Sequence, residues 1–112
     1  MTNKKSKAVI YLGPALGNIS QDEMLSECRR LCYDKRLDVL EIFREQPSDR
    51  VELRTEFQRL VETCLGDHST ITHVAVYEFS GLFRDYLEFE YYSRKFEAAK
   101  ISLISATRDT PD

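Results

Sequence analysis

The sequence has no tryptophan, only two histidines and only three cysteines among 112 residues. An odd, small number of cysteines argues against a disulfide framework and favours a reducing, cytoplasmic environment. No apolar run approaches the roughly 18 residues that a membrane-spanning helix needs, and the polar first residues lack the apolar stretch of a signal peptide. The formal net charge is −3, so a bulk positive charge that would attract nucleic acid is also absent. We therefore expect a cytoplasmic protein that does not associate with membranes.

The scarcity of cysteine and histidine also limits metal and nucleophile chemistry. Cys28 and Cys32 are four residues apart, but both fall on the apolar stripe of one predicted helix, where a free cysteine behaves as a small hydrophobic residue. His68 and His73 lie around the start of a predicted strand, away from the sheet edge where α/β proteins carry their functional loops. The sequence therefore predicts no metal site, no cofactor and no histidine-based catalysis.

What the chain does have is the composition and the alternation of one α/β domain. Hydrophobic residues make up 42% of the chain and charged residues 31%, and the length suits a single core. Short apolar or β-branched runs predict strands, and amphipathic stretches between them predict helices. The predicted strands are 8–12, 39–43, 71–77 and 101–105; the predicted helices run from Ser20 to about Lys35, from a start between Asp49 and Thr55 to Gly66, and from about Leu82 to Ala98.

This order of elements, βαβαβαβ, predicts a mainly parallel sheet of about four strands, because each crossover is long enough for parallel pairing. Such crossovers are almost always right-handed, so we expect helices on both faces and a three-layer α/β domain over residues 1–112. Residues 1–6 are expected to be a disordered tail, and residues 107–112 a tail that leaves the domain.

Local signals also predict how the helices end. Ser20 and Glu23 have the spacing of a capping box, in which each side chain satisfies a backbone N–H group. The second helix has two possible caps, Asp49-x-x-Glu52 and Thr55-x-x-Gln58, and Gly66 is predicted to close it.

In such a sheet, ligands bind beyond the carboxyl ends of the strands. Gly13, Pro14 and Ala15 follow the first strand and carry no reactive group. The Gly13-x-x-x-Gly17 spacing matches neither the dinucleotide fingerprint nor the P-loop. Arg54 and Arg84 lie near the starts of the second and third predicted helices. If both approach this edge they would form an anion or phosphate site; the alternative is that both are surface ion-pair partners.

Five segments, taken in order, carry a resemblance along almost the whole chain. They are Ala8-Val-Ile-Tyr-Leu12, Glu27-Cys-Arg-Arg-Leu31, Arg54-Thr-Glu-Phe-Gln-Arg-Leu-Val-Glu62, Val74-Ala-Val-Tyr-Glu-Phe-Ser-Gly-Leu-Phe-Arg-Asp85 and Ile101-Ser-Leu-Ile-Ser-Ala-Thr107. They resemble, respectively, the opening strand, the first helix, the Arg-Pro-x-Leu-x-x-Leu-Leu segment, the Val-Val-Val-Tyr-Lys-Leu-Asp-Arg-Leu-x-Arg-Asp motif and the last core strand of one family. That family is the serine recombinases, or resolvases and invertases, and the likeness is to their catalytic domain.

The resemblance implies a chemistry that this chain has lost. In the family a serine attacks a DNA phosphate, and arginine and aspartate side chains stabilise the charge. Here the serine position is Ala15, and an alanine methyl cannot attack phosphorus. Contacts of the lost arginine type are worth roughly 3 kcal/mol each. The degenerate positions are Gly13, Ala15, Met24, Ser80 and Gly81, which stand where the family has Arg, Ser, Gln, Asp and Arg.

Only Arg54 and Arg84 match the catalytic set of the family, and Tyr11 is kept in a role that packing explains. The resemblance thus predicts a pseudoenzyme, which leans against an enzymatic activity. We expect an inactive domain that acts, if at all, through protein contacts in or near a DNA recombination or transposition system. The partner would be a recombinase-type protein or a second copy of the chain, because the third helix has more aromatic residues than one core stripe buries.

Three alternatives stay open at the level of sequence. One is a small anion- or phosphate-binding domain, or an enzyme, that uses Arg54 and Arg84. Another is an excised domain of a longer DNA-binding recombinase homologue, since the family continues into a dimerisation helix and a DNA-binding region that do not follow Asp112. DNA would then bind only weakly, or through that missing region. A third is a relic without a selected activity.

Overall fold

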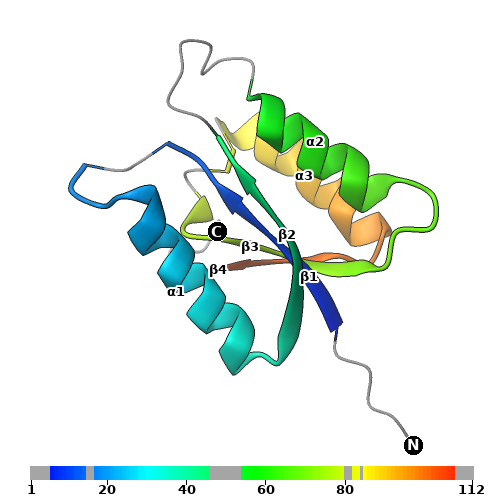
Figure 1. Cartoon of the computed structure of the whole chain (residues 1–112). Helices are drawn as coiled ribbons and strands as arrows, with labels where there is room; N and C mark the ends of the chain where they lie inside the picture. Colours follow the sequence, from blue (N-terminus) through cyan, green and yellow to red (C-terminus); the bar gives the residue numbers. More distant parts are fainter. Residues whose placement is uncertain (1–5, 15–16, 46–53, 80–81, 84, 108–112) are drawn as a thin grey trace, which may run out of the picture.

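The computed structural model describes residues 6–14, 17–45, 54–79, 82–83 and 85–107. Its elements are β1 (Ser6–Leu12), α1 (Gln21–Asp34), β2 (Leu37–Arg44), α2 (Thr55–Leu65), β3 (Ile71–Val76), α3 (Tyr86–Ala98) and β4 (Ser102–Ser105). All strand pairs are parallel, and the sheet order is β2-β1-β3-β4 (Figure 1). The predicted α/β class, with four parallel strands alternating with helices, is confirmed.

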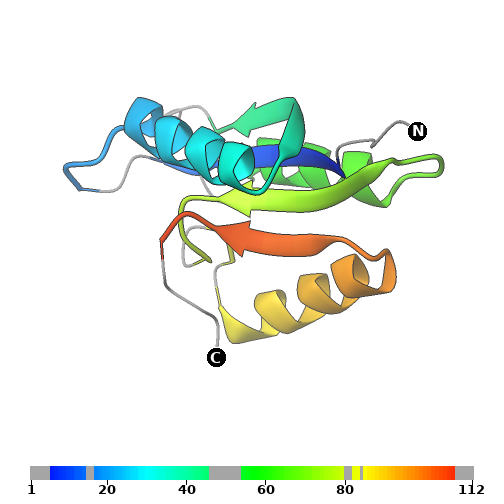
Figure 2. The ribbon, with the colours of Figure 1, turned by 90° about the horizontal axis from the view of Figure 1, so that it is seen from below.

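The first strand forms the centre of the core. Ala8, Ile10 and Leu12 of β1 pack in a cluster with α1, whereas Val9 and Tyr11 pack in a second cluster with α2 and α3. All five side chains are buried, because helices cover both faces of the sheet. This arrangement explains why β1 is a continuous apolar run rather than an alternating one. Figure 1 shows α1 on one side of the sheet and α2 and α3 on the other, and Figure 2 shows α3 alongside the edge strand β4.

Several boundaries differ from the prediction. β1 begins at Ser6, which pairs with Leu37 of β2, so the polar residue expected in a tail belongs to the sheet. The third helix begins at Tyr86 and not near Leu82. The reason is a cap: an oxygen of the Asp85 carboxylate accepts a hydrogen bond from the backbone N–H of Glu88 at 2.8 Å. Leu82 is buried in a turn before the helix, where its N–H donates to a carbonyl oxygen at 2.9 Å.

The helix caps were predicted with mixed success. The capping box of Ser20 and Glu23 at the start of α1 is confirmed. Thr55 is the first residue of α2 and does not cap it; the N-cap is Arg54, in the left-handed region at φ 44°, with no side-chain cap bond of its own. The other predicted cap, Asp49 with Glu52, lies outside the described residues. Gly66 is the C-cap, as predicted, in an extended conformation.

The three cysteines are free and buried. Burial raises the pKa of Cys28 and of Cys64 to about 12 in each case, so both thiols stay protonated at neutral pH. Their interpretation as small hydrophobic residues is confirmed. No group of three or more His, Cys, Asp or Glu side chains among the described residues is arranged to hold a metal. Each helix in the described part of the chain is too short or too polar to cross a bilayer.

Candidate functional site at the carboxyl edge of the sheet

A small cavity lies where β1 and β3 end. Its volume is about 120 Å³, and the described residues that line it are Tyr11, Gly13, Pro14, Met24, Val76, Tyr77 and Glu78. Most of this lining is apolar. Among the described lining residues there is no cationic side chain, and Glu78 is the one carboxylate. A carboxylate at this place disfavours a phosphate by charge repulsion.

One amide side chain joins Gly13, the residue after β1, to Glu45, the residue after β2. Gln21 Nε2 donates to the carbonyl oxygen of Gly13 at 2.7 Å and to that of Glu45 at 2.8 Å. Gln21 is the first residue of α1, so the capped helix start carries the amide to the ends of both β1 and β2. Gln21 was not among the residues predicted from the sequence; the predicted residue of this helix was Met24, which lies one turn further along and is buried. The position of Gln21 was predictable, because it directly follows the Ser20 cap and is therefore the first residue of the helix.

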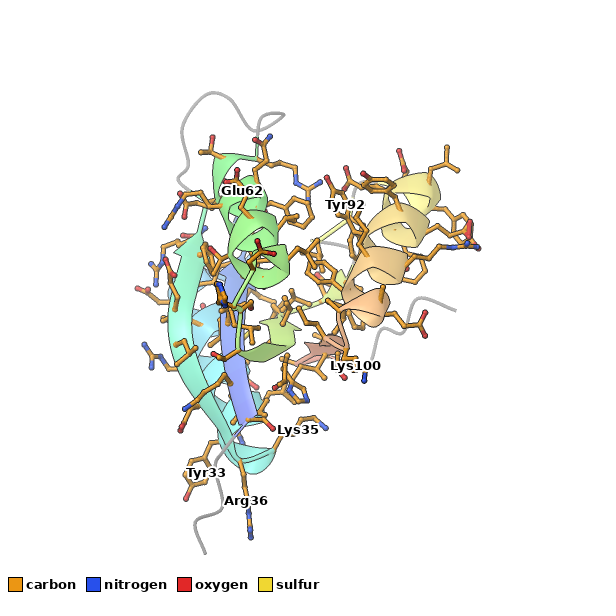
Figure 3. All side chains as sticks on the ribbon, turned by 90° about the vertical axis from the view of Figure 1, so that its right-hand side faces the viewer. Tyr33, Lys35, Arg36, Glu62, Tyr92 and Lys100 are labelled. Atoms are coloured by element: carbon orange, nitrogen blue, oxygen red, sulfur yellow. The ribbon has the colours of Figure 1, made fainter. Side chains whose placement is uncertain are left out.

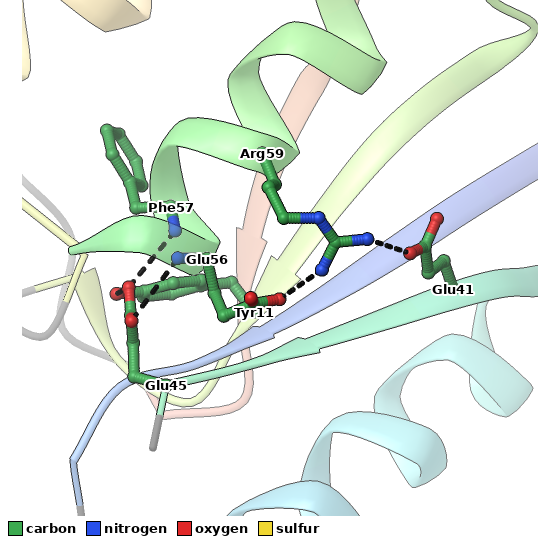
Figure 4. A network of polar contacts seen from close by, with 6 residues as sticks. All are labelled: Tyr11, Glu41, Glu45, Glu56, Phe57 and Arg59. Atoms are coloured by element: carbon green, nitrogen blue, oxygen red, sulfur yellow. Dashed lines mark hydrogen bonds and ion pairs between the residues drawn. The ribbon is translucent and has the colours of Figure 1, made fainter. Parts of the chain in front are cut away.

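Glu45, just beyond β2, is the centre of a polar network (Figure 4). Its carboxylate accepts hydrogen bonds from the Tyr11 hydroxyl at 2.9 Å, from the backbone N–H of Phe57 at 3.0 Å and from that of Glu56 at 3.3 Å. The last two groups belong to the first turn of α2, so Glu45 supplies the cap that this helix lacks locally. Glu45 was not predicted from the sequence.

This network also determines the protonation state of the Tyr11 hydroxyl. Burial, and then the hydrogen bond to Glu45, raises the pKa of Tyr11 well above its usual value. The phenol therefore stays protonated and donates a hydrogen bond to Glu45, which makes it a poor nucleophile. Tyr11 packs in the core, as expected. In addition, its hydrogen bond to Glu45 connects β1 to the end of β2 and, through Glu45, to α2.

Arg54 is held inside the fold by three neighbours. Its guanidinium forms an ion pair with Glu88, donates to the carbonyl oxygen of Leu82, and lies over the Phe57 ring with Cζ 4.1 Å from the ring centroid. Only 11% of the side chain is exposed. Arg54 thus joins the start of α2 to the start of α3. It is an ion-pair partner, as one of the two interpretations had it, but a mostly buried one and not the surface partner that was expected.

The other predicted site residues fall outside the described part of the chain. These are Ala15, Ser80, Gly81 and Arg84. Of the predicted set, the structure brings Gly13 and Met24 together at the cavity, and it places Arg54 in the network between α2 and α3. A further arginine near this edge, Arg44, forms an ion pair with Asp22 at 3.2 Å.

The histidines lie away from this edge, as predicted. His73 pairs with Ala8 and Ser102 in the amino-terminal half of the sheet, and His68 is an exposed residue of the turn before β3. Burial lowers the pKa of His73, and its Nδ1 lies 2.8 Å from the Thr72 hydroxyl. Neither imidazole is placed to assist chemistry at the cavity.

Comparison with known proteins identifies the class of this domain. A sequence model described as the N-terminal domain of resolvases matches residues 18–112, which is most of the chain. The chain therefore belongs to the resolvase N-terminal domain family. A search of curated proteins gave no match. The family predicted from the sequence is confirmed.

Solved structures agree with this assignment at the level of fold. The C-terminal catalytic domain of ISC1926 TnpA, an IS607-like serine recombinase, is similar with a TM-score of 0.71 and 19% identity, over 89% of this chain and 70% of that one. The N-terminal catalytic domain of TP901-1 integrase is similar with a TM-score of 0.69 and 20% identity, over 90% of this chain and 77% of that one. The fold is that of a serine-recombinase catalytic domain.

Proposed function

We propose that this chain is a catalytically inactive serine-recombinase-like domain that acts through protein contacts in a DNA recombination or transposition system. The observation that carries the proposal is the end of β1. Gly13, Pro14 and Ala15 stand where the family presents a serine and an arginine. The cavity that Gly13 and Pro14 line is mostly apolar, and Glu78 is the one carboxylate among its described lining residues.

Phosphodiester cleavage needs a nucleophile and a positive charge that stabilises the transition state. Tyr11, the phenol nearest the end of β1, is protonated and bonded to Glu45. Arg54 is occupied by Glu88, by the Leu82 carbonyl and by Phe57, so its charge already stabilises the fold. The match to the family begins at residue 18, after the segment that would hold the serine. Each of these facts supports loss of the chemistry with retention of the fold.

A role in protein contacts is consistent with the parts of the fold that this chain retains. The core around β1 is buried, and Gln21 bonds the backbone of Gly13 and Glu45 at the carboxyl edge, so the described part of this edge has a defined backbone. The partner would be a recombinase-type protein or a second copy, within one domain over residues 1–112. The free, buried thiols fit a reducing cytoplasmic setting.

The test of inactivity is an adduct assay. The chain is incubated with supercoiled DNA that carries sites of an active serine recombinase, and that recombinase serves as the positive control. We expect neither nicking nor a protein–DNA adduct that survives denaturation with this chain, whereas the control forms both. A covalent adduct with this chain would overturn the proposal.

The proposed protein contacts are tested by a second measurement. Co-expression with the active recombinase in a reporter strain should change the recombination rate, because a domain of the same fold competes for protein contacts. The matched control is the same chain with Ala75→Asp, a charge placed at a fully buried position, which prevents folding. An unchanged rate with the wild-type chain would contradict a contact with that recombinase.

A further inference from the structure

The cavity at the ends of β1 and β3 lies at the switch point of the sheet. In the order β2-β1-β3-β4, the chain passes from β1 to β2 on one side and adds β3 and β4 on the other. Open α/β sheets bind ligands at this point. The volume of about 120 Å³ exceeds the roughly 30 Å³ of one water molecule and is below the roughly 300 Å³ of a pocket for a whole small molecule. The cavity therefore fits a short chain of a few heavy atoms and is too small for a nucleotide.

Glu78 gives this cavity a negative charge without a counter-ion. Its carboxylate forms no ion pair or hydrogen bond within the part of the chain that the structure describes, and no cationic side chain is among the described lining residues. The family motif Val-Val-Val-Tyr-Lys-Leu-Asp-Arg has a lysine where this chain has Glu78, so the charge at this position is reversed. A group that enters the cavity beside Glu78 is therefore favoured if it is a cation.

The other charged side chains that the structure describes at the carboxyl edge already have partners. Three carboxylates cap the starts of helices: Glu23 caps α1, Glu45 caps α2 and Asp85 caps α3. The arginines are held in the ion pairs Arg44–Asp22, Arg54–Glu88 and Arg59–Glu56. Carboxylates outnumber cations in this described set, so its field also favours a positively charged ligand.

The rest of the lining determines what kind of cation fits. Tyr11 and Tyr77 are among the lining residues, and aromatic rings attract cations. Val76, Met24 and Pro14 add apolar surface, against which the methylene groups of an aliphatic chain pack. An ammonium has three N–H donors and a guanidinium five, so an ammonium leaves fewer donors unpaired in a mostly apolar cavity. A short aliphatic chain that ends in an ammonium group matches this lining.

The lysines of the described chain lie at the opposite edge of the sheet. They occupy the start of β1, the connection from α1 to β2, the last turn of α3 and the connection from α3 to β4, as Lys7, Lys35, Lys95 and Lys100. Figure 3 labels Lys35 and Lys100. Because none of these four reaches the ends of β1 and β3, an ammonium group in the cavity belongs to another molecule.

We propose that the cavity at the ends of β1 and β3 binds an alkylammonium group, with Glu78 as its counter-ion. The inference rests on the proposed loss of phosphate chemistry at this edge, and it names the chemical class of ligand that the altered site takes. Two sources carry this chemistry: a lysine side chain of a partner protein and a free aliphatic amine.

The first experiment is a titration of the ¹⁵N-labelled full chain, followed by the amide signals of Gly13, Tyr77 and Glu78. The probes are n-butylammonium, n-butanol and butyrate, which have chains of similar size and different charge. The ammonium should shift these signals saturably and bind at least about tenfold more tightly than the alcohol. Butyrate should not bind, because Glu78 repels it. Equal binding of the three probes, or no saturable shift with the ammonium, overturns the proposal.

A charge-neutral variant tests the role of Glu78. Glu78→Gln keeps the shape of the side chain and should weaken the binding of n-butylammonium at least about tenfold, with n-butanol unaffected. The matched control is Glu62→Gln, which removes the same charge from an exposed position on α2 that does not line the cavity (Figure 3). The amide spectra also show whether each variant is folded. An equal effect of the two substitutions would mean that only the net charge matters and would overturn the site.

A blocked lysine distinguishes the two sources. The probe is Nα-acetyl-lysine N-methylamide, whose only cation is the side-chain ammonium between two neutral amides. Binding as tight as that of n-butylammonium supports a lysine side chain of a partner protein. Binding of n-butylammonium alone supports a free amine. If neither probe binds, the proposal is wrong.

The adduct assay on the same samples separates this inference from the proposed function. A chain that forms no DNA adduct and binds no alkylammonium refutes the ammonium site alone. A chain that forms an adduct refutes the inactivity, whatever it binds.

Discussion

Arg54 shows how a residue that resembles a catalytic one serves the fold. Its guanidinium contacts Glu88, the Leu82 carbonyl and Phe57, and only 11% of the side chain is exposed. We expect Arg54→Ala to lower the free energy of unfolding by about 3 kcal/mol, because a mostly buried ion pair and its hydrogen bond are lost. Urea unfolding followed by circular dichroism measures this loss.

The matched control is Arg59, which lies on the same helix. Its side chain is 51% exposed and pairs with Glu41 and Glu56 at the surface. Arg59→Ala should cost less than about 1 kcal/mol, as solvent screens such pairs. Equal losses for the two variants would show that the contacts of Arg54 contribute no more than a surface pair, and would make its charge available to a ligand.

At the scale of elements, α2 is a helix capped from another part of the chain. The carboxylate of Glu45 accepts hydrogen bonds from the first-turn N–H groups of Glu56 and Phe57, and from the hydroxyl of Tyr11. Glu45→Ala removes all three bonds, whereas Tyr11→Phe removes only the last. We expect Glu45→Ala to be the more destabilising, by about 1–2 kcal/mol, the value of a helix cap.

Hydrogen exchange locates the effect. The backbone N–H groups of Glu56 and Phe57 should exchange faster in the Glu45→Ala chain and remain protected in the Tyr11→Phe chain. If both variants lose the same stability and the same protection, Glu45 acts only through Tyr11 and the capping role is wrong.

Elements with local signals were predictable from the sequence, and those that depend on distant residues were not. The apolar run of β1 and the Ser20–Glu23 box are encoded by neighbouring residues. The Glu45 cap joins residues 12 apart, and the ion pair of Arg54 with Glu88 joins residues 34 apart. For the candidate site, the sequence predicts a missing nucleophile at Ala15, but the engagement of Arg54 by its neighbours depends on tertiary packing that no local pattern contains.

At the scale of the whole molecule, buried protonated groups lower the free energy of unfolding as the pH rises above 9. The pKa of the Cys28 and Cys64 thiols is raised from 9.0 to about 12 in the folded chain. The unfolded chain therefore releases these protons first. The thiol contribution is fully present below pH 9 and is lost as the pH rises toward 12, by about 1.4 kcal/mol per pH unit for each thiol.

This dependence is measured by urea unfolding under reducing conditions at pH 8, 9, 10 and 11. Tyr11, whose pKa is also raised, adds to the decline once the pH exceeds 10. A Cys28→Ala chain is less stable throughout, but its decline above pH 9 should be shallower by one thiol. An identical slope in the two chains would show that Cys28 does not hold its proton in the folded state.

The order β2-β1-β3-β4 also has a consequence for biosynthesis. Of the four strands of this sheet, the strand β1 leaves the ribosome first, and its five consecutive buried residues then have no neighbouring strand. One flank is covered only when β2 is complete at Arg44, and the other only when β3 is complete at Val76. Parallel pairing across long crossovers is slow, so this apolar segment is synthesised before the strands that enclose it and is covered late. Until Val76 has been synthesised, the nascent chain therefore exposes this apolar segment, which favours aggregation.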